Sequence, residues 1–246
     1  MTTDKIGLAI PCVYENFFIN KYLILLMQHS PEYFYENIKI DAIFGNFPYC
    51  IWDGGRKTIN YTYATIEEIK QICLFYNNYD IPIRFIYTNN QIQKEHLDNR
   101  FCNLVTSICE NNLNEIVINS PILEEYIRKT YPSYKIISST TKCLTDKTLV
   151  LNELNKEDYY RVCLDYNLNY NIDFLNSLNE QQKNKVELLA NALCGINCTN
   201  RMNHYKLNSL SALHYGKDYK LDYCNLINRH HLYPCESQLS SMINIQ

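Results

Sequence analysis

The sequence predicts a single α/β domain built as a TIM-like (β/α) barrel, either closed or incomplete at its eighth strand. Its 246 residues suit one such barrel, which commonly takes about 250. Short apolar runs alternate along the chain with segments of helical periodicity, which is typical of βαβ units and a parallel sheet. Several runs are continuously apolar, as expected for strands that meet helices on one face and a barrel core on the other.

The apolar runs define seven expected strands. They cover residues 5–12, 38–47, 83–87, 115–119, 134–139, 160–165 and 185–191. Helical spacing predicts helices at 15–29, 65–74, 94–111, 123–130, 172–184 and 201–213. One of these helices begins with a capping-box pattern, in which Glu68 follows Thr65 by three positions. Residues 223–229 are either the eighth strand or a loop. No low-complexity linker divides the chain, so we expect one domain over 1–246 with an irregular tail at 230–246.

Composition narrows the class of protein. A net charge of −3 gives no general attraction for nucleic acid. The N-terminus lacks the regions of a signal peptide, and no apolar run approaches the roughly 18 residues of a membrane helix. Eleven cysteines are an odd number, and a chain of this size does not depend on disulfides. We therefore expect a cytoplasmic protein with reduced thiols and no membrane contact.

Polar side chains follow the ends of several predicted strands, where the active site of an α/β barrel lies. The candidate substrate-binding residues at these ends are Asn46, Asn119 and Lys142. The candidates to orient a substrate or transfer protons are Asp165, Asn191 and His204. The alternative interpretation is that the asparagines cap the following helices and that the lysine is solvated.

The loop from Cys50 to Arg56 reads Cys-Ile-Trp-Asp-Gly-Gly-Arg and follows a predicted strand end. Adjacent glycines let backbone amides turn toward an anion, and an arginine can form paired hydrogen bonds to carboxylate or phosphate. Arg56 is therefore a further candidate substrate-binding residue. A tight turn with a surface arginine is the alternative.

Late cysteines form the strongest constellation in the sequence. Cys194 and Cys198 lie four apart after the seventh predicted strand, and Cys224 and Cys235 follow. Four thiolates, or three with His204, match the ligand set of an iron–sulfur cluster or of zinc. The remaining alternative is that these cysteines are small buried hydrophobic residues, which is how we interpret the cysteines in the earlier strands and helices.

The run Val186-Glu-Leu-Leu-Ala-Asn-Ala-Leu-Cys194, with a second cysteine shortly after, resembles the collagenase-like peptidase family. That family includes oxygen-independent hydroxylases of tRNA and of quinone precursors. The resemblance implies a TIM-like barrel with a [4Fe–4S] cluster near its late strands. Its ligands would be Cys194, Cys198, Cys224 and Cys235. This resemblance is the only reason to expect RNA as a partner.

Three functions follow from these observations. The leading one is a cytoplasmic metal-dependent, iron–sulfur enzyme that performs hydroxylation or related redox chemistry on a small or nucleic-acid-borne substrate. Peptide hydrolysis is less supported, because the sequence shows neither a Ser–His–Asp order nor an H-E-x-x-H helix. The second is a binding or scaffold subunit, with structural zinc or no metal, that joins a protein partner or a second copy through its C-terminal region. The third is a metal-free barrel enzyme that holds a phosphorylated metabolite with Arg56 and Lys142.

Overall fold

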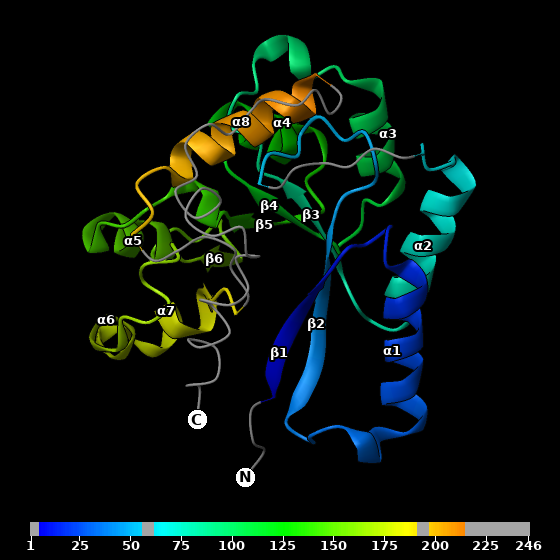
Figure 1. Cartoon of the computed structure of the whole chain (residues 1–246), viewed down its shortest axis with the longest axis horizontal. Coiled ribbons are helices and arrows are strands. Elements are labelled where there is room, and N and C mark those ends of the chain that lie inside the picture. Colours follow the sequence, from blue (N-terminus) through cyan, green and yellow to red (C-terminus); the bar gives the residue numbers. More distant parts are fainter. Residues whose placement is uncertain (1–4, 56–61, 191–196, 215–246) are drawn as a thin grey trace, which may run out of the picture.

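The computed structural model describes residues 5–55, 62–190 and 197–214. Their fold is a curled sheet of seven parallel strands, paired in chain order from β1 to β7 (Figure 1). The strands are β1 (Ile6–Pro11), β2 (Ile38–Gly45), β3 (Ile83–Tyr87), β4 (Glu115–Ile118), β5 (Lys135–Ser138), β6 (Arg161–Cys163) and β7 (Val186–Glu187). The predicted TIM-like fold is confirmed over these seven strands. The segment 223–229, predicted to be either an eighth strand or a loop, lies outside the described residues.

Helices alternate with the strands, and all of them except α8 lie on the convex face of the sheet (Figure 1). They are α1 (Phe17–His29), α2 (Ile66–Asn78), α3 (Arg100–Ile108), α4 (Pro121–Thr130), α5 (Lys147–Leu154), α6 (Ile172–Ser177), α7 (Glu180–Lys185) and α8 (Arg201–Leu213). Three single-turn 3₁₀ helices occupy Pro31–Tyr33, Lys94–His96 and Thr140–Lys142. None of the helices in the described ranges has the length and apolar content of a membrane span.

Local capping explains where several helices begin. Thr65 Oγ1 accepts the Glu68 N–H at 3.2 Å, and the Glu68 carboxylate accepts the Thr65 N–H at 2.7 Å. This is the predicted capping box. The helix expected at 172–184 is instead divided into α6 and α7, because the Asn179 side chain accepts the Gln182 N–H and starts a new helix. The helix expected at 94–111 likewise begins only at Arg100, where Asn99 is the cap.

The predicted late strands are shorter than expected. The seventh strand ends at Glu187, although the apolar residues Leu188, Leu189 and Ala190 follow it in the sequence. Helix α5 was not predicted, and its start is fixed by Asp146, whose carboxylate accepts the Thr148 and Leu149 N–H groups at 2.8 and 3.1 Å. The apolar residues of α5 do not recur at helical spacing, which is the pattern that predicted the other helices.

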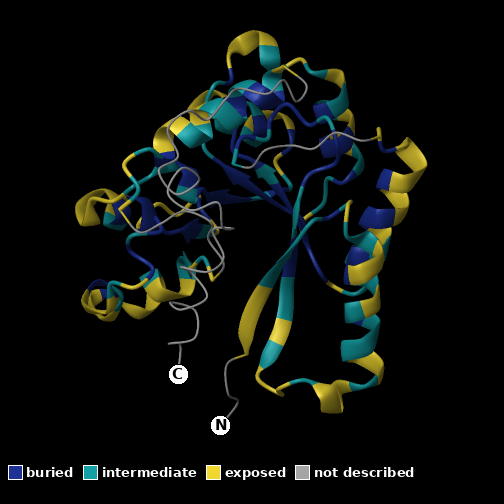
Figure 2. Ribbon diagram, in the orientation of Figure 1, coloured by how far each residue is buried: buried dark blue, intermediate teal, exposed yellow. Residues whose placement is uncertain are grey.

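The apolar core lies between the sheet and its helices (Figure 2). Alternate residues of β3, Ile83, Phe85 and Tyr87, are buried against this layer, as are Ile116 and Ile118 of β4. Figure 2 also shows exposed residues on β1 and on the adjoining part of β2. The first edge of the sheet is therefore the least covered part of the described structure.

The concave interior of the sheet carries charge at the N-terminal ends of the strands. Arg84 of β3 is 1% exposed and meets three carboxylates. Its Nε donates to Glu115 of β4 at 2.6 Å, and its Nη1 donates to Glu187 of β7 at 2.6 Å. Its Nη2 lies 3.7 Å from Asp41 of β2. Burial would lower the pKa of Arg84, but the two glutamates outweigh burial and raise it.

A bulge brings Asp41 into this cluster. Leu8 pairs with Ile40 and the next residue, Ala9, pairs with Ala42, so the register between β1 and β2 skips Asp41. The skipped residue reaches Arg161 of β6, whose Nη1 lies 2.7 Å from its carboxylate. β-Bulges commonly redirect a side chain in this way.

Replacement of Arg84 by methionine is expected to lower the free energy of unfolding by about 3–5 kcal/mol, because three carboxylates lose their buried counter-ion. Urea titration at pH 7 followed by circular dichroism measures this. The control is Lys39→Met, since the half-exposed Lys39 ammonium pairs with the same Asp41 at 3.1 Å. The control is expected to cost less than about 1 kcal/mol. Equal losses in the two variants would contradict the central role of Arg84.

Candidate functional site

The mouth of the half-barrel, at the carboxyl ends of its strands, contains a buried ion pair. Arg201, the first residue of α8, donates from Nη1 to both carboxylate oxygens of Asp165 at 3.0 and 2.8 Å. Both residues are buried. The Arg201 Nη2 also donates to Asn167 Oδ1 at 3.1 Å, and the guanidinium lies 5.3 Å from the centre of the Tyr166 ring. Asp165 is therefore held by its partner and suited to fixing the shape of the mouth.

Helix α8 lies across this mouth (Figure 1). The Asn89 side chain, at the end of β3, donates to the Ser209 carbonyl of α8 at 3.0 Å. The Asn90 N–H donates to Ser209 Oγ at 3.2 Å. The helix is thus joined to the strand ends by polar contacts.

Packing requires the first glycine of the Gly-Gly-Arg loop. A Cβ atom on Gly54 would overlap Ser209 Oγ and would lie 2.5 Å from Asn89 Cα. Gly55 lies over β3, where a Cβ atom would be 3.1 Å from Thr88 Oγ1. The close approach of the loop to β3 and α8 therefore accounts for Gly54 without an anion. Arg56 lies outside the described residues.

The candidate asparagines have different positions. Asn46 donates to the Ile86 carbonyl at 2.8 Å and accepts the Ile86 N–H at 3.1 Å, which extends the pairing of β2 with β3 beyond the strand end. Asn119 lies at the mouth and donates to Thr141 Oγ1 at 2.7 Å. Asn191 lies outside the described residues.

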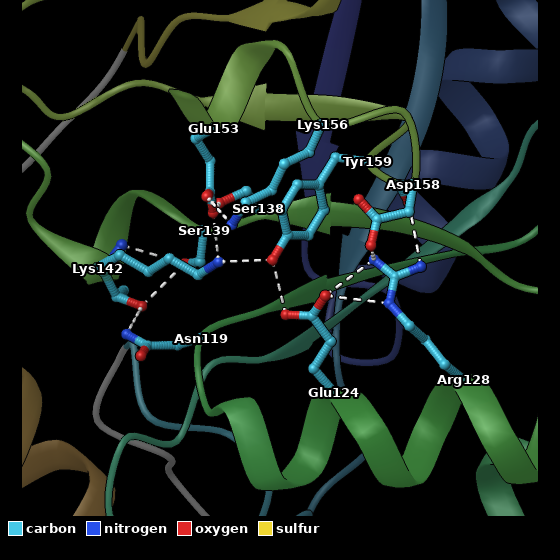
Figure 3. A network of polar contacts seen from close by, with 11 residues as sticks. Asn119, Glu124, Arg128, Ser138, Ser139, Lys142, Glu153, Lys156, Asp158 and Tyr159 are labelled. Carbon is cyan, nitrogen blue, oxygen red and sulfur yellow. Dashed lines mark hydrogen bonds and ion pairs between the residues drawn. The ribbon is translucent and has the colours of Figure 1, made fainter. Parts of the chain in front are cut away.

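Lys142 extends away from Asn119 into the helical layer (Figure 3). Its ammonium donates to Glu153 Oε1 at 2.6 Å and to Tyr159 Oη at 2.9 Å. Tyr159 in turn donates to Glu124 at 2.7 Å, and Glu124 accepts from Arg128. The lysine therefore joins α4, α5 and the segment before β6, and its charge is already paired.

His204 and Thr88 are polar groups without described partners at the mouth. In the described part of the chain, His204 Nε2 and Thr88 Oγ1 are buried atoms with no hydrogen-bond partner. Burial lowers the pKa of His204, so the imidazole is neutral at pH 7. Its Nε2 is available to accept a proton or a hydrogen bond.

Of the four cysteines predicted as metal ligands, Cys198 falls within the described residues. It is half-buried, and its thiol has no hydrogen-bond partner in those residues. The preceding residue, Asn197, has a positive φ of 58°. The Cys198 carbonyl accepts the Arg201 N–H at 3.4 Å. The cysteine therefore belongs to the loop that leads into α8.

The described residues do not by themselves assemble a metal site. Within 5–55, 62–190 and 197–214, no three His, Cys, Asp or Glu side chains gather closely enough to hold a metal ion. Three of the four proposed cysteine ligands, Cys194, Cys224 and Cys235, lie outside these ranges. The other cysteines that the structure describes include Cys50, Cys73, Cys102, Cys109 and Cys163, all of them buried.

Sequence reasoning did not find the pairing of Asp165 with Arg201. The two residues are 36 positions apart, and the pairing of a strand end with the start of a distant helix leaves no local pattern. The close approach of Gly54 to Ser209 likewise leaves no local pattern in the sequence.

These features define an α/β half-barrel of the TIM type with a polar mouth, and a solved structure shares this fold. That structure is described as "The Structure of the U32 Peptidase Mk0906". The two chains align with a TM-score of 0.58 over 94% of this chain and 86% of the other, at 13% sequence identity. The likeness supports a distant resemblance to the collagenase-like peptidases at the level of fold. No family model and no curated protein matches the sequence.

Lowering the pH is expected to remove the contribution of Glu153 to stability. Burial raises the pKa of Glu153, but hydrogen bonds from Lys142, Lys156 and Ser138 outweigh it and lower the pKa from 4.5 to about 2. A carboxylate with a lowered pKa stabilises the fold above about pH 4.5, and this stabilisation disappears as the pH falls through about 2.

The test compares the free energy of unfolding of the wild type and Glu153→Gln between pH 7 and pH 3. Since one pKa unit corresponds to about 1.4 kcal/mol, the difference is expected to be about 3 kcal/mol at pH 7 and to shrink below pH 4.5. Glu180→Gln, which removes an exposed carboxylate, is the control. A difference that does not change with pH would show that Glu153 contributes by packing alone.

Proposed function

We propose that this chain is an enzyme of the collagenase-like peptidase type that binds a polar substrate at the mouth of its half-barrel. It carries an iron–sulfur cluster held by Cys198 together with Cys194, Cys224 and Cys235. The position of Cys198 carries the proposal: it lies in the loop that the Asp165–Arg201 pair joins to the mouth. The similarity of fold to a U32 peptidase supports it as well.

The chemistry of Cys198 fits a metal ligand. The cysteines in the strands and helices are buried, whereas Cys198 is half-buried in a loop and its thiol makes no hydrogen bond within the described residues. Thiolates are the ligands of iron–sulfur clusters and are common ligands of zinc. A bound cluster would supply electron transfer next to the substrate.

The other residues of the mouth are proposed to hold α8 in place, accept a proton and bind the substrate. Asp165 and Arg201 neutralise each other and hold α8 over the strand ends. His204 is the proposed proton acceptor, because its Nε2 has no hydrogen-bond partner in the described residues and its lowered pKa leaves the imidazole unprotonated at pH 7. Thr88 and Asn119 provide hydroxyl and amide groups for a polar substrate. The sequence also predicts that Arg56 binds the substrate and that Asn191 orients it or transfers protons.

The reaction we propose is hydroxylation or related redox chemistry in the cytoplasm, on a small or RNA-borne substrate. Peptide hydrolysis is a less supported alternative reaction for the same enzyme. The third function predicted from the sequence, in which Arg56 and Lys142 hold a phosphorylated metabolite, draws no support from the described contacts. The Lys142 ammonium is paired with Glu153, and packing requires Gly54.

Anaerobically purified protein is expected to contain iron and acid-labile sulfide and to absorb broadly in the visible range. Cys198→Ala is expected to lose most of the iron, because one of four ligands is missing. Cys143→Ala, a half-buried cysteine outside the proposed ligand set, is expected to retain it. Colourless protein with stoichiometric zinc would favour a structural metal. The absence of any metal after anaerobic reconstitution would contradict the cluster.

The second candidate function is that of a binding or scaffold subunit. Exposed apolar residues at the β1 edge of the sheet favour it. On α1, Phe18, Ile19 and Tyr22 are 80%, 67% and 68% exposed. On β1, Ile6 and Leu8 are also exposed, and β1 has one neighbouring strand in the described sheet. Open edges and apolar patches of this kind are typical of contact surfaces. The C-terminal region predicted to bind a partner lies outside the described residues.

If α1 joins two copies, light scattering after gel filtration is expected to show a wild-type dimer. Replacement of Phe18 and Tyr22 by aspartate should give a monomer, because charge on an apolar contact surface is costly to bury. Tyr33→Asp is the control, since Tyr33 is equally exposed but lies outside α1. A wild type that stays monomeric at all concentrations tested would exclude self-association.

A further inference from the structure

We infer that Asn167 is a positioning residue for Cys198; this inference rests on the proposed role of Cys198 as a ligand. Asn167 Oδ1 accepts two hydrogen bonds, from the Asn197 N–H at 2.8 Å and from Arg201 Nη2 at 3.1 Å. These two donors lie immediately before Cys198 and at the start of α8. One amide oxygen therefore holds the cysteine loop from both sides.

Asn167 is itself fixed in place. Its backbone N–H donates to Asp165 Oδ1 at 2.8 Å, and the same carboxylate binds Arg201. Asp165, Asn167 and Arg201 thus form a closed triangle of hydrogen bonds at the end of β6. The loop that carries Cys198 is attached to this triangle, so its position follows from the position of the strand.

The backbone around Cys198 depends on this attachment. Asn197 has a φ of 58°, in the left-handed region that asparagine tolerates better than most residues. Its N–H is bound by Asn167, and the Cys198 carbonyl is bound by the Arg201 N–H. The peptide group before Asn197 and the peptide group after Cys198 are both held, so the backbone at Cys198 is restricted before a metal binds, and this limits the directions open to its side chain. Preorganisation of this kind reduces the entropy lost when a ligand set closes around a metal.

The test measures the thiol in metal-free, full-length protein. The rate of Cys198 alkylation by iodoacetamide is followed by peptide mass spectrometry. Asn167→Ala is expected to raise this rate several-fold, up to about tenfold, because a hydrogen bond that held the loop is lost. Asn167→Asp retains an acceptor oxygen at the same place and is expected to restore the wild-type rate.

Asn169→Ala is the matched control, since Asn169 lies two residues away and donates to Leu189 and not to the cysteine loop. Alkylation of Cys143 is the internal reference for global unfolding. Equal Cys198 rates in the wild type and Asn167→Ala would overturn the inference. So would an aspartate variant that behaves like the alanine variant.

Hydrogen exchange of the wild type provides a measurement that does not depend on a variant folding. The Asn197 amide is expected to be protected, and exchange at the rate of an open amide would overturn the inference. Metal analysis of the wild type separates the two proposals. If the wild type binds no metal, the proposed function fails, whereas the alkylation rates still decide whether Asn167 positions Cys198.

Discussion

The buried cation Arg84 is the constraint on which the shape of this protein depends. Its guanidinium is paired with carboxylates from β2, β4 and β7. Neighbouring strands lie about 4.8 Å apart, so β2 and β7 would be about 24 Å apart in a flat sheet. Arg161 nevertheless lies 2.7 Å from Asp41 of β2 and 3.9 Å from Glu187 of β7. The sheet must curl for these charges to meet, and the curl creates the mouth.

The interior is therefore divided into layers along the strands. Charged residues occupy the N-terminal ends, apolar residues such as Val117 and Ile137 the middle, and hydroxyl and amide groups the carboxyl ends. This order agrees with the general separation in α/β barrels between a stabilising end and a chemically variable end. The outer members of this ionic layer, Asp41 and Glu187, remain partly in contact with water.

At the opposite end, the mouth is organised by contacts between residues far apart in sequence. Asp165 and Asn167 hold the first residue of α8, and Asn89 holds the middle of the same helix. Helix α8 and the cysteine loop are consequently fixed to the strand ends. Among the described charged groups, Asp165 and Arg201 at this mouth are paired with each other, and Lys142 is directed into the helical layer.

The sequence by itself determined the fold class, the place of all seven strands and the capping box at Thr65. These features depend on local periodicity and on residues three or four apart. It also placed Asn119 and Asp165 at strand ends, because parallel strands end on one side of a sheet. Only the tertiary structure decided which partner each polar side chain meets: Asp165 meets Arg201, and Lys142 meets Glu153. Such pairs join elements that come together only when the sheet has curled, so no local pattern records them.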